Sequence, residues 1–216
     1  MLKKFLVAAL IMANAVFAQI HYGGRAAMNI GSAWGDYSDD ANWGIGFNVG
    51  AIAKIGIDPI IEFIPGLEMD FRRIGIESCE TEEYQGYDIK VTQKISLEMW
   101  YLDIPVVARA NVVPRLHVDI GVLFSFEIAA YVHFDATVSA LDQSETLSDN
   151  ADYSKFITIF DPGLIAGFGV SIIPDLLDID FRFVLGLASF GDEDAGVVFF
   201  RSQHMRMQLG ATFWFL

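Results

Sequence analysis

The sequence predicts an all-β protein: a closed antiparallel transmembrane β-barrel of about eight strands. Three observations predict this class. Hydrophobic residues make up 53% of the chain and charged residues 19%, yet no stretch after the N-terminus has the ~18 uncharged apolar residues that a spanning helix needs. Apolar residues instead recur at every second position. Short and long connections alternate along the chain, as they do in outer-membrane barrels.

The N-terminus predicts an export signal. Met1–Lys4 carries two lysines, Phe5–Ala13 is an unbroken apolar run, and Val16–Ala18 ends in small residues before Gln19. This arrangement is typical of a cleaved secretory signal peptide, and it predicts a signal at 1–18 and a barrel domain at 19–216. Loss of Lys3 and Lys4 reduces the basic residues from 14 to 12 against 28 acidic ones, a balance that argues against a nucleic-acid partner.

Period-two alternation defines the strands. It is clearest at Leu116–Tyr131, where even-numbered positions are apolar and odd-numbered ones are mixed, small or charged, so that one face is suited to lipid. In the strand at 95–110, Leu97 and Met99 are out of phase with Trp100 and Leu102, which predicts a β-bulge near Trp100. The expected strands are 20–30, 43–55, 63–75, 95–110, 116–131, 157–172, 178–190 and 202–216.

The connections fall into two classes. Three are short and contain Asp58-Pro59, Val113-Pro114 and Pro174-Asp175, residues that favour tight turns. Four are long and polar, at 31–42, 76–94, 132–156 and 191–201, and are expected to be acidic external loops, with Cys79 as an incidental loop thiol. Short turns and both termini then belong on the periplasmic side.

The polar face of the strands is expected to line the barrel lumen. A soluble lipocalin-like barrel, with these charges facing solvent, is the alternative. Because an eight-stranded barrel is just wide enough to be filled by side chains, the charges are expected to pair and plug the lumen. The predicted network comprises Arg25, Glu68, Asp70, Arg72, Asp103, Arg109, Asp119, Glu127, Asp161, Asp180, Arg182 and Arg206, with Lys54 on the same face. Aromatic girdles at the membrane interfaces are expected from Trp43, Trp100, Tyr101, Phe190, Trp214 and Phe215.

Five segments carry a family resemblance: Phe63-Ile64-Pro65-Gly66-Leu67, Tyr101-Leu102-Asp103-Ile104-Pro105, Asp119-Ile120-Gly121-Val122, Asp161-Pro162-Gly163-Leu164 and Arg182-Phe183-Val184-Leu185-Gly186-Leu187. With them the chain resembles the PorT-like outer-membrane β-barrel domain family, a member of the porin-type barrels. Ile64 departs from the usual Glu, and Leu216 follows the terminal aromatics. The resemblance implies a signal-bearing outer-membrane barrel and implies no activity.

The function expected from the sequence is a non-enzymatic scaffold for envelope or surface interactions. The alternatives are a narrow solute channel and a lipid A-modifying enzyme, the latter because Ser202 and His204 share a strand face. No metal site is expected from His21, His117, His133 and His204, whose spacing fits no ligand pattern, and no cofactor is expected. Divalent-cation binding by Asp192-Glu193-Asp194 is the alternative to plainly solvated loops. The expected partners are outer-membrane lipid and lipopolysaccharide, the outer-membrane assembly machinery and an unidentified surface or envelope protein.

Overall fold

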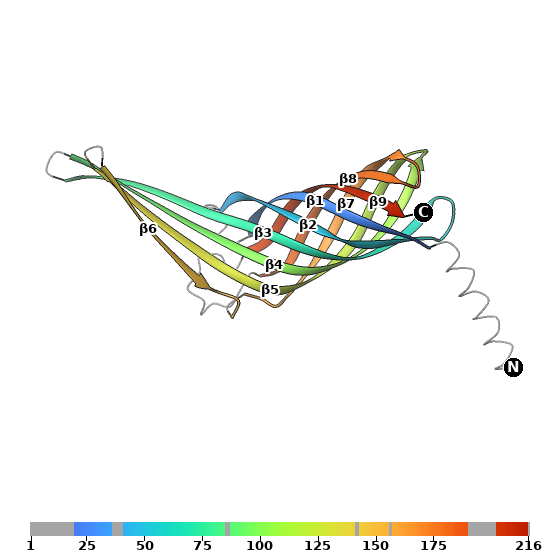
Figure 1. Cartoon of the computed structure of the whole chain (residues 1–216), viewed down its shortest axis with the longest axis horizontal. Coiled ribbons are helices and arrows are strands. Elements are labelled where there is room, and N and C mark those ends of the chain that lie inside the picture. Colours follow the sequence, from blue (N-terminus) through green and yellow to red (C-terminus); the bar gives the residue numbers. More distant parts are fainter. Residues whose placement is uncertain are drawn as a thin grey trace.

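The computed structural model describes residues 20–35, 41–84, 87–140, 143–155, 157–189 and 202–215. Figure 1 shows a barrel from which a long twisted sheet projects on the side away from the C-terminus. The described strands are β1 (Ile20–Gly35), β2 (Ala41–Gly56), β3 (Ile61–Tyr84), β4 (Tyr87–Val113), β5 (Leu116–Ala140), β6 (Gln143–Asp152), β7 (Phe160–Ile173), β8 (Leu177–Ser189) and β9 (Ser202–Phe215).

Eight of these strands close into a ring. Each pairs antiparallel with its neighbours in the order β4-β3-β2-β1-β9-β8-β7-β5, and β4 also pairs with β5 to complete the circle. The prediction of a closed barrel of about eight strands is therefore confirmed. The ninth strand, β6, pairs with β5 alone among the described strands and stands outside the ring.

The three short connections are turns, as predicted. Arg115 and Asp175 have φ angles of 78° and 58°, and each follows a proline that presets the first central position of the turn. In the remaining turn, between β2 and β3, the backbone N–H groups of Ile60 and Ile61 donate to the side chain of Asp58 at 2.7 and 2.8 Å. The turns, the start of β1 and the C-terminus lie at the same end of the barrel (Figure 1).

The prediction of loops at 76–94 and 132–156 is wrong. β3 and β4 continue as a paired hairpin as far as Tyr84 and Tyr87, and β6 pairs with the last ten residues of β5. Residue 79 is therefore part of β3 and not of a loop. We call the projecting sheet the extension: residues 77–84 of β3, 87–98 of β4, 131–140 of β5, and β6. The sequence of these segments is polar, which suggested loops.

A bulge is present, but it lies on β5. The register shifts between Trp100, which pairs with Ala129, and Tyr101, which pairs with Glu127, so the extra residue is Ile128. β4 keeps its phase without interruption: Leu97, Met99 and Tyr101 are all buried inside. Beyond the bulge the faces of β5 exchange, so the expectation that Ala130 faces lipid and Tyr131 the lumen is wrong.

Polarity inverts between the barrel and the extension. In the ring the inward face is polar and the outward face is apolar. In the extension, the inward face carries Val91, Ile95, Phe134, Val138 and Leu147, whereas the outward face carries Lys94, Glu98, His133, Asp135 and Thr137. This inversion marks the level at which the wall passes from lipid into water.

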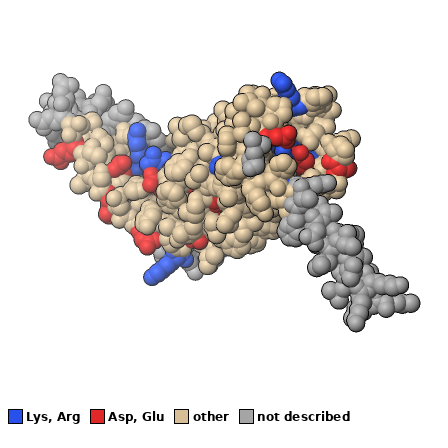
Figure 2. Space-filling model, turned by 45° about the vertical axis from the view of Figure 1, so that its right-hand side comes forward, with Lys and Arg blue, Asp and Glu red and all other residues tan. Residues whose placement is uncertain are grey.

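The outer wall of the ring is a belt of exposed apolar side chains, among them Met28, Val49, Ile120, Phe168 and Leu209. Figure 2 shows charged residues over the extension and at the opposite end, with a largely uncharged wall between them. This distribution fits a hydrocarbon layer around the middle of the barrel.

Two of the predicted girdle residues are not on the wall. Tyr101 and Trp214 are buried in the lumen, whereas Trp43 and Phe215 are exposed as predicted. Phe190 lies outside the described residues. Among the described residues, no helix is long and apolar enough to cross a bilayer.

Candidate functional site: the barrel lumen and the outer wall

The lumen holds a cluster of buried charges contributed by β3, β4, β7 and β9. It consists of Asp70, Arg72, Asp103, Asp161 and Arg206, and we call it the Arg72 cluster. Arg72 donates to Asp70 at 2.6 Å, to Asp103 at 2.9 Å and to Asp161 at 3.1 Å. Arg206 pairs with Asp103 at 2.8 Å and also with Asp70. Asp70, Arg72, Asp103 and Arg206 thus form a closed ring of alternating charge.

Neutral groups add further hydrogen bonds to this cluster. Arg72 Nη2 donates to Ser125 Oγ at 2.7 Å, and Asn29 Nδ2 donates to Asp70 Oδ1 at 3.1 Å. The guanidinium of Arg72 also lies over the ring of Tyr101, 3.9 Å from its centroid, in cation–π geometry. Burying charge is favourable only with this degree of satisfaction, since an unpaired buried ion costs several kcal/mol.

A second group of charges lies nearer the three short turns. Its members alternate in sign, and we call it the Arg25 chain: Glu68, Arg25, Asp180, Arg182, Asp119, Arg109 and Asp178. Its shortest contacts are Arg25 Nη2 to Asp180 Oδ1 at 2.7 Å and Arg109 Nη1 to Asp178 Oδ2 at 2.8 Å. Trp214 Nε1 donates to Asp178 at 2.9 Å, at the end of the Arg25 chain nearest the short turns.

Glycine makes room for these arginines. A Cβ on Gly210 would lie 2.6 Å from Arg25 Nη2, and one on Gly167 would lie 3.0 Å from the Arg182 side chain. Both distances are shorter than ordinary van der Waals contact. The inward glycines of β7 and β9 therefore let long charged side chains cross a narrow lumen.

Apolar side chains seal the lumen on both sides of the Arg72 cluster. Toward the extension, one layer consists of Ala33, Ile74, Leu97, Met99, Tyr101, Ala130 and Ile157, which we call the outer cap. Ile157 reaches it because the chain returns to the barrel after β6: Tyr153 donates its N–H to the carbonyl of Ala130 at 2.9 Å. The second layer consists of Ile52, Ile64, Val107, Leu123, Ile165, Val184 and Trp214.

The structure places all of the predicted lumen residues except one in these two groups. Glu127 is half-buried beside the bulge and pairs with none of the described basic side chains. Lys54 is buried and pairs with Asp175 at 3.3 Å, at the rim that carries the short turns. His117 is buried inside, on the face of Asp119 as the alternation of β5 predicts. Asp178 was not predicted although it is also buried inside, and it lies two residues from the predicted Asp180, so strand parity could have found it.

The histidine considered for catalysis faces the lumen. His204 Nε2 lies 3.3 Å from the Tyr101 hydroxyl and 3.9 Å from Asp161, and both Ser202 and His204 are buried inside the ring. These side chains therefore face the lumen and not the outer wall. Within the described part of the chain, no three His, Cys, Asp or Glu residues are arranged to hold a metal ion, and Asp192–Asp194 lie outside it.

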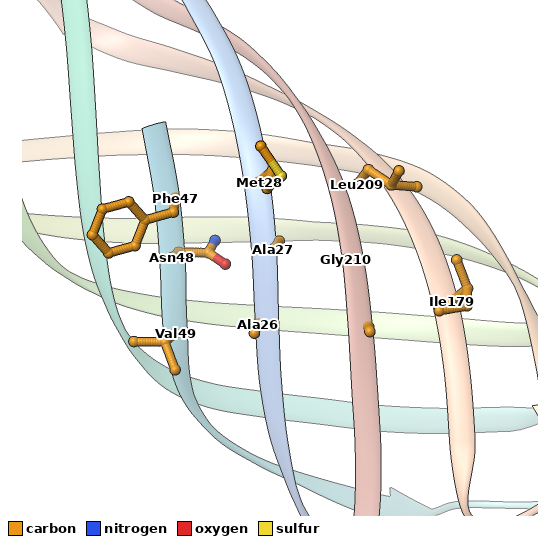
Figure 3. Close-up of a pocket in the computed structure, with 10 residues that line it drawn as sticks. Ala26, Ala27, Met28, Phe47, Asn48, Val49, Ile179, Leu209 and Gly210 are labelled. Carbon is orange, nitrogen blue, oxygen red and sulfur yellow. The ribbon is translucent and has the colours of Figure 1, made fainter. Parts of the chain in front are cut away.

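The outer wall has a shallow apolar depression of about 500 Å³ on β1, β2, β8 and β9. Its floor is formed by Ala26 and Ala211, which are cross-strand partners. Figure 3 shows Met28 and Leu209 along one side of it and Val49 on the other. Two small residues side by side among large ones leave a hollow on the lipid-facing surface.

Comparison with known proteins identifies the family. No curated protein sequence matches the chain significantly. Among solved structures, Ail of Yersinia pestis is 15% identical (TM-score 0.41; 91% of this chain and 99% of that one covered). Neisserial surface protein A is 11% identical (TM-score 0.43; 90% and 97%), and CarO of Acinetobacter baumannii is 10% identical (TM-score 0.42; 89% and 97%). The family model described as "outer membrane protein beta-barrel domain" matches residues 17–191. Since this match spans well over half of the chain, the protein belongs to the outer membrane protein β-barrel domain family and resides in the outer membrane.

Proposed function

We propose that this protein is a non-enzymatic, non-conducting scaffold that holds the extension above the outer membrane for interaction with envelope or surface proteins. The observation that carries the proposal is a contrast in packing. The lumen is filled by two charge groups and two apolar layers, whereas the extension exposes side chains on both of its faces. A filled barrel with a large exposed sheet is better suited to display than to transport.

Ion pairs that cross the lumen support the non-conducting part of the proposal. Arg72 on β3 pairs with Asp161 on β7, and Arg206 on β9 pairs with Asp103 on β4, and none of these strand pairs are neighbours in the ring. A solute path would have to break such pairs, at about 3–5 kcal/mol for each charge left unpaired. It would also have to cross the outer cap.

The proposal includes lipid, lipopolysaccharide and the outer-membrane assembly machinery as partners, and membership of the PorT-like family. Lipid and lipopolysaccharide would surround the apolar wall, with acyl chains packing into the depression at Ala26 and Ala211. The assembly machinery would read β9, which ends in aromatic residues. The PorT-like assignment is supported by Tyr101-Leu102-Asp103-Ile104-Pro105, because Tyr101 and Asp103 both help to build the Arg72 cluster.

Conductance in planar bilayers tests the filled lumen. The purified protein is expected to insert without a stable open level, with an open porin in the same bilayers as the positive control. Reproducible open levels in the wild-type protein would favour the rival function, a narrow solute channel.

Crosslinking in intact cells tests the scaffold role. The test variant is shortened by replacing 80–91 and 136–147 with Asn-Gly turns, each cut lying between cross-strand partners. Proteins crosslinked to the wild-type extension are expected to be lost in this variant, while heat-modifiable gel migration confirms that its barrel is folded. If every crosslink and every phenotype survives the shortening, the scaffold role is wrong.

A further inference from the structure

The outer edge of the extension has a row of backbone hydrogen-bonding groups that pair with none of the described strands, although the N–H of Asn150 donates to the side chain of Asp149 at 2.8 Å. β6 pairs with β5 in an unbroken register from Gln143 to Asp152, and it is the last strand of the sheet. In an antiparallel sheet, alternate residues of an edge strand point their N–H and C=O groups away from the partner. β6 contains no proline, lysine or bulge, which are three of the means by which proteins block an edge, and its inward-pointing charges are the carboxylates of Glu145 and Asp149.

The inward face of the extension carries a group of apolar side chains although it stands outside the lipid. Phe134 and Val138 on β5 are 37% and 43% exposed, and Leu147 on β6 is 76% exposed. Val91 and Ile95 of β4 lie beside them in register. An exposed apolar surface of this kind next to an open strand edge marks an interaction site.

The outward face of the same sheet already satisfies its own polar groups. Thr137 and Thr146 share a hydrogen bond at 3.0 Å, and His133 contacts Asn150 at 2.6 Å. Glu98 also lies 3.2 Å from His133. The inward face of β6 differs: Leu147 is flanked by Glu145 and Asp149, which point to the same side and are exposed.

We infer that β6 is a docking edge for an extended segment of a partner polypeptide with the pattern basic–x–apolar–x–basic. The added strand would continue the sheet through the free backbone groups of β6. Its apolar side chain would cover Leu147, and its two basic side chains would face Glu145 and Asp149 at cross-strand distance. Because backbone pairing is central, the partner is a polypeptide, and a polyanion is disfavoured by the two carboxylates.

This inference rests on the proposed scaffold function and names the site and partner chemistry within it. The test uses the full-length protein in nanodiscs and a labelled peptide, Thr-Lys-Thr-Ile-Thr-Lys-Thr. Binding is followed by fluorescence anisotropy, and hydrogen exchange reports on the amides of 144–151. The wild-type protein is expected to bind the peptide and to gain protection along β6. The same peptide N-methylated at alternate residues is expected not to bind, since it lacks the donors for pairing.

Charge reversal supplies the decisive control. E145Q/D149N is expected to weaken binding at least about tenfold, whereas D135N/D152N, which removes two charges from the outward face, should leave it within about twofold. E145K/D149K is expected to reject the peptide and to bind the version with Glu in place of both Lys. Heat-modifiable migration verifies that each variant is folded.

Two results would overturn the docking edge: no binding by the wild-type protein, or equal binding by E145Q/D149N and D135N/D152N. In either case the crosslinking experiment separates the two proposals. Crosslinks that still depend on the extension would preserve the scaffold role while eliminating this edge as its site.

Discussion

Arg73 and Glu98 face each other across β3 and β4 on the outer wall, where they form an ion pair. The next outward-facing pair toward the short turns is Phe71 and Trp100, whose ring centroids are 5.0 Å apart. Aromatic rings favour the membrane interface and exposed ion pairs favour water. The wall therefore passes from lipid to solvent between these two cross-strand pairs.

Neighbouring arginines on opposite faces should differ sharply in their contribution to stability. Arg72→Ala leaves three buried acids facing Arg206 alone, so it is expected to destabilise the barrel by about 3–5 kcal/mol. Arg73→Ala removes only an exposed pair and should cost at most about 1 kcal/mol. Urea unfolding of both variants in micelles, followed by tryptophan fluorescence, measures the difference. Equal losses would mean that the Arg72 cluster does not stabilise the fold.

The space above Gly210 should be essential to the Arg25 chain. Gly210→Val is expected to displace the Arg25 side chain and to cost about 1–3 kcal/mol through overpacking. Gly24→Ala is the matched control, because a Cβ at Gly24 meets its nearest atom, Phe215 Cζ, at 3.8 Å. Thermal transitions of the two variants by circular dichroism provide the comparison. A Gly210→Val transition as high as that of the control would contradict this account of the glycine.

A charge on the lipid face should be penalised according to its depth. Val122→Arg lies in the apolar belt and is expected to cost about 2–4 kcal/mol. Thr137→Arg, on the outward face of the extension, should cost almost nothing because that face is in water. Unfolding in lipid vesicles measures both. If the two substitutions cost the same, the assignment of the membrane level is wrong.

Adjacent cysteines should report the two faces of β5. In a Cys79→Ser background, cysteine in place of Val122 (39% exposed) is expected to react with a lipid-soluble maleimide. Cysteine in place of Leu123 (4% exposed) should not react in the folded barrel and should react after unfolding. The opposite labelling pattern would mean that the faces are inverted.

The barrel could be predicted from sequence because, within the membrane-spanning part of the ring strands, alternate residues face the lumen and the lipid. β9 illustrates this: Met207, Leu209 and Phe213 face outward and Arg206, Gln208 and Thr212 inward, as the alternation predicts. Acids and arginines of one parity must share the lumen, so most members of the two charge groups followed directly. Which acid pairs with which arginine did not follow, because the pairs join strands that are not neighbours.

The bulge and the extension could not be separated in the sequence of β5. Even-numbered residues are apolar from Val118 to Val138, which suggests one continuous face. In fact they point outward before Ile128 and inward after it, and the wall leaves the lipid at nearly the same level. In β5 the bulge exchanges the two faces and the change from lipid to water exchanges their polarity, so the apolar residues stay at even-numbered positions. In β4, which has no bulge, only the change of solvent remains, and it appears as the phase break between Met99 and Trp100.

The closed ring of charge in the Arg72 cluster has a consequence for the order of assembly. Asp70 and Asp103 come from the third and fourth strands, whereas Arg206 comes from the last, 136 residues after Asp70. Until β9 docks against β1 and β8, those two acids and Asp161 have Arg72 as their only arginine within the cluster. The final strand therefore brings the missing countercharge. A barrel released before β9 docks would leave the buried acids of the Arg72 cluster without Arg206. Closure of the strand ring and completion of this charge cluster are therefore a single event.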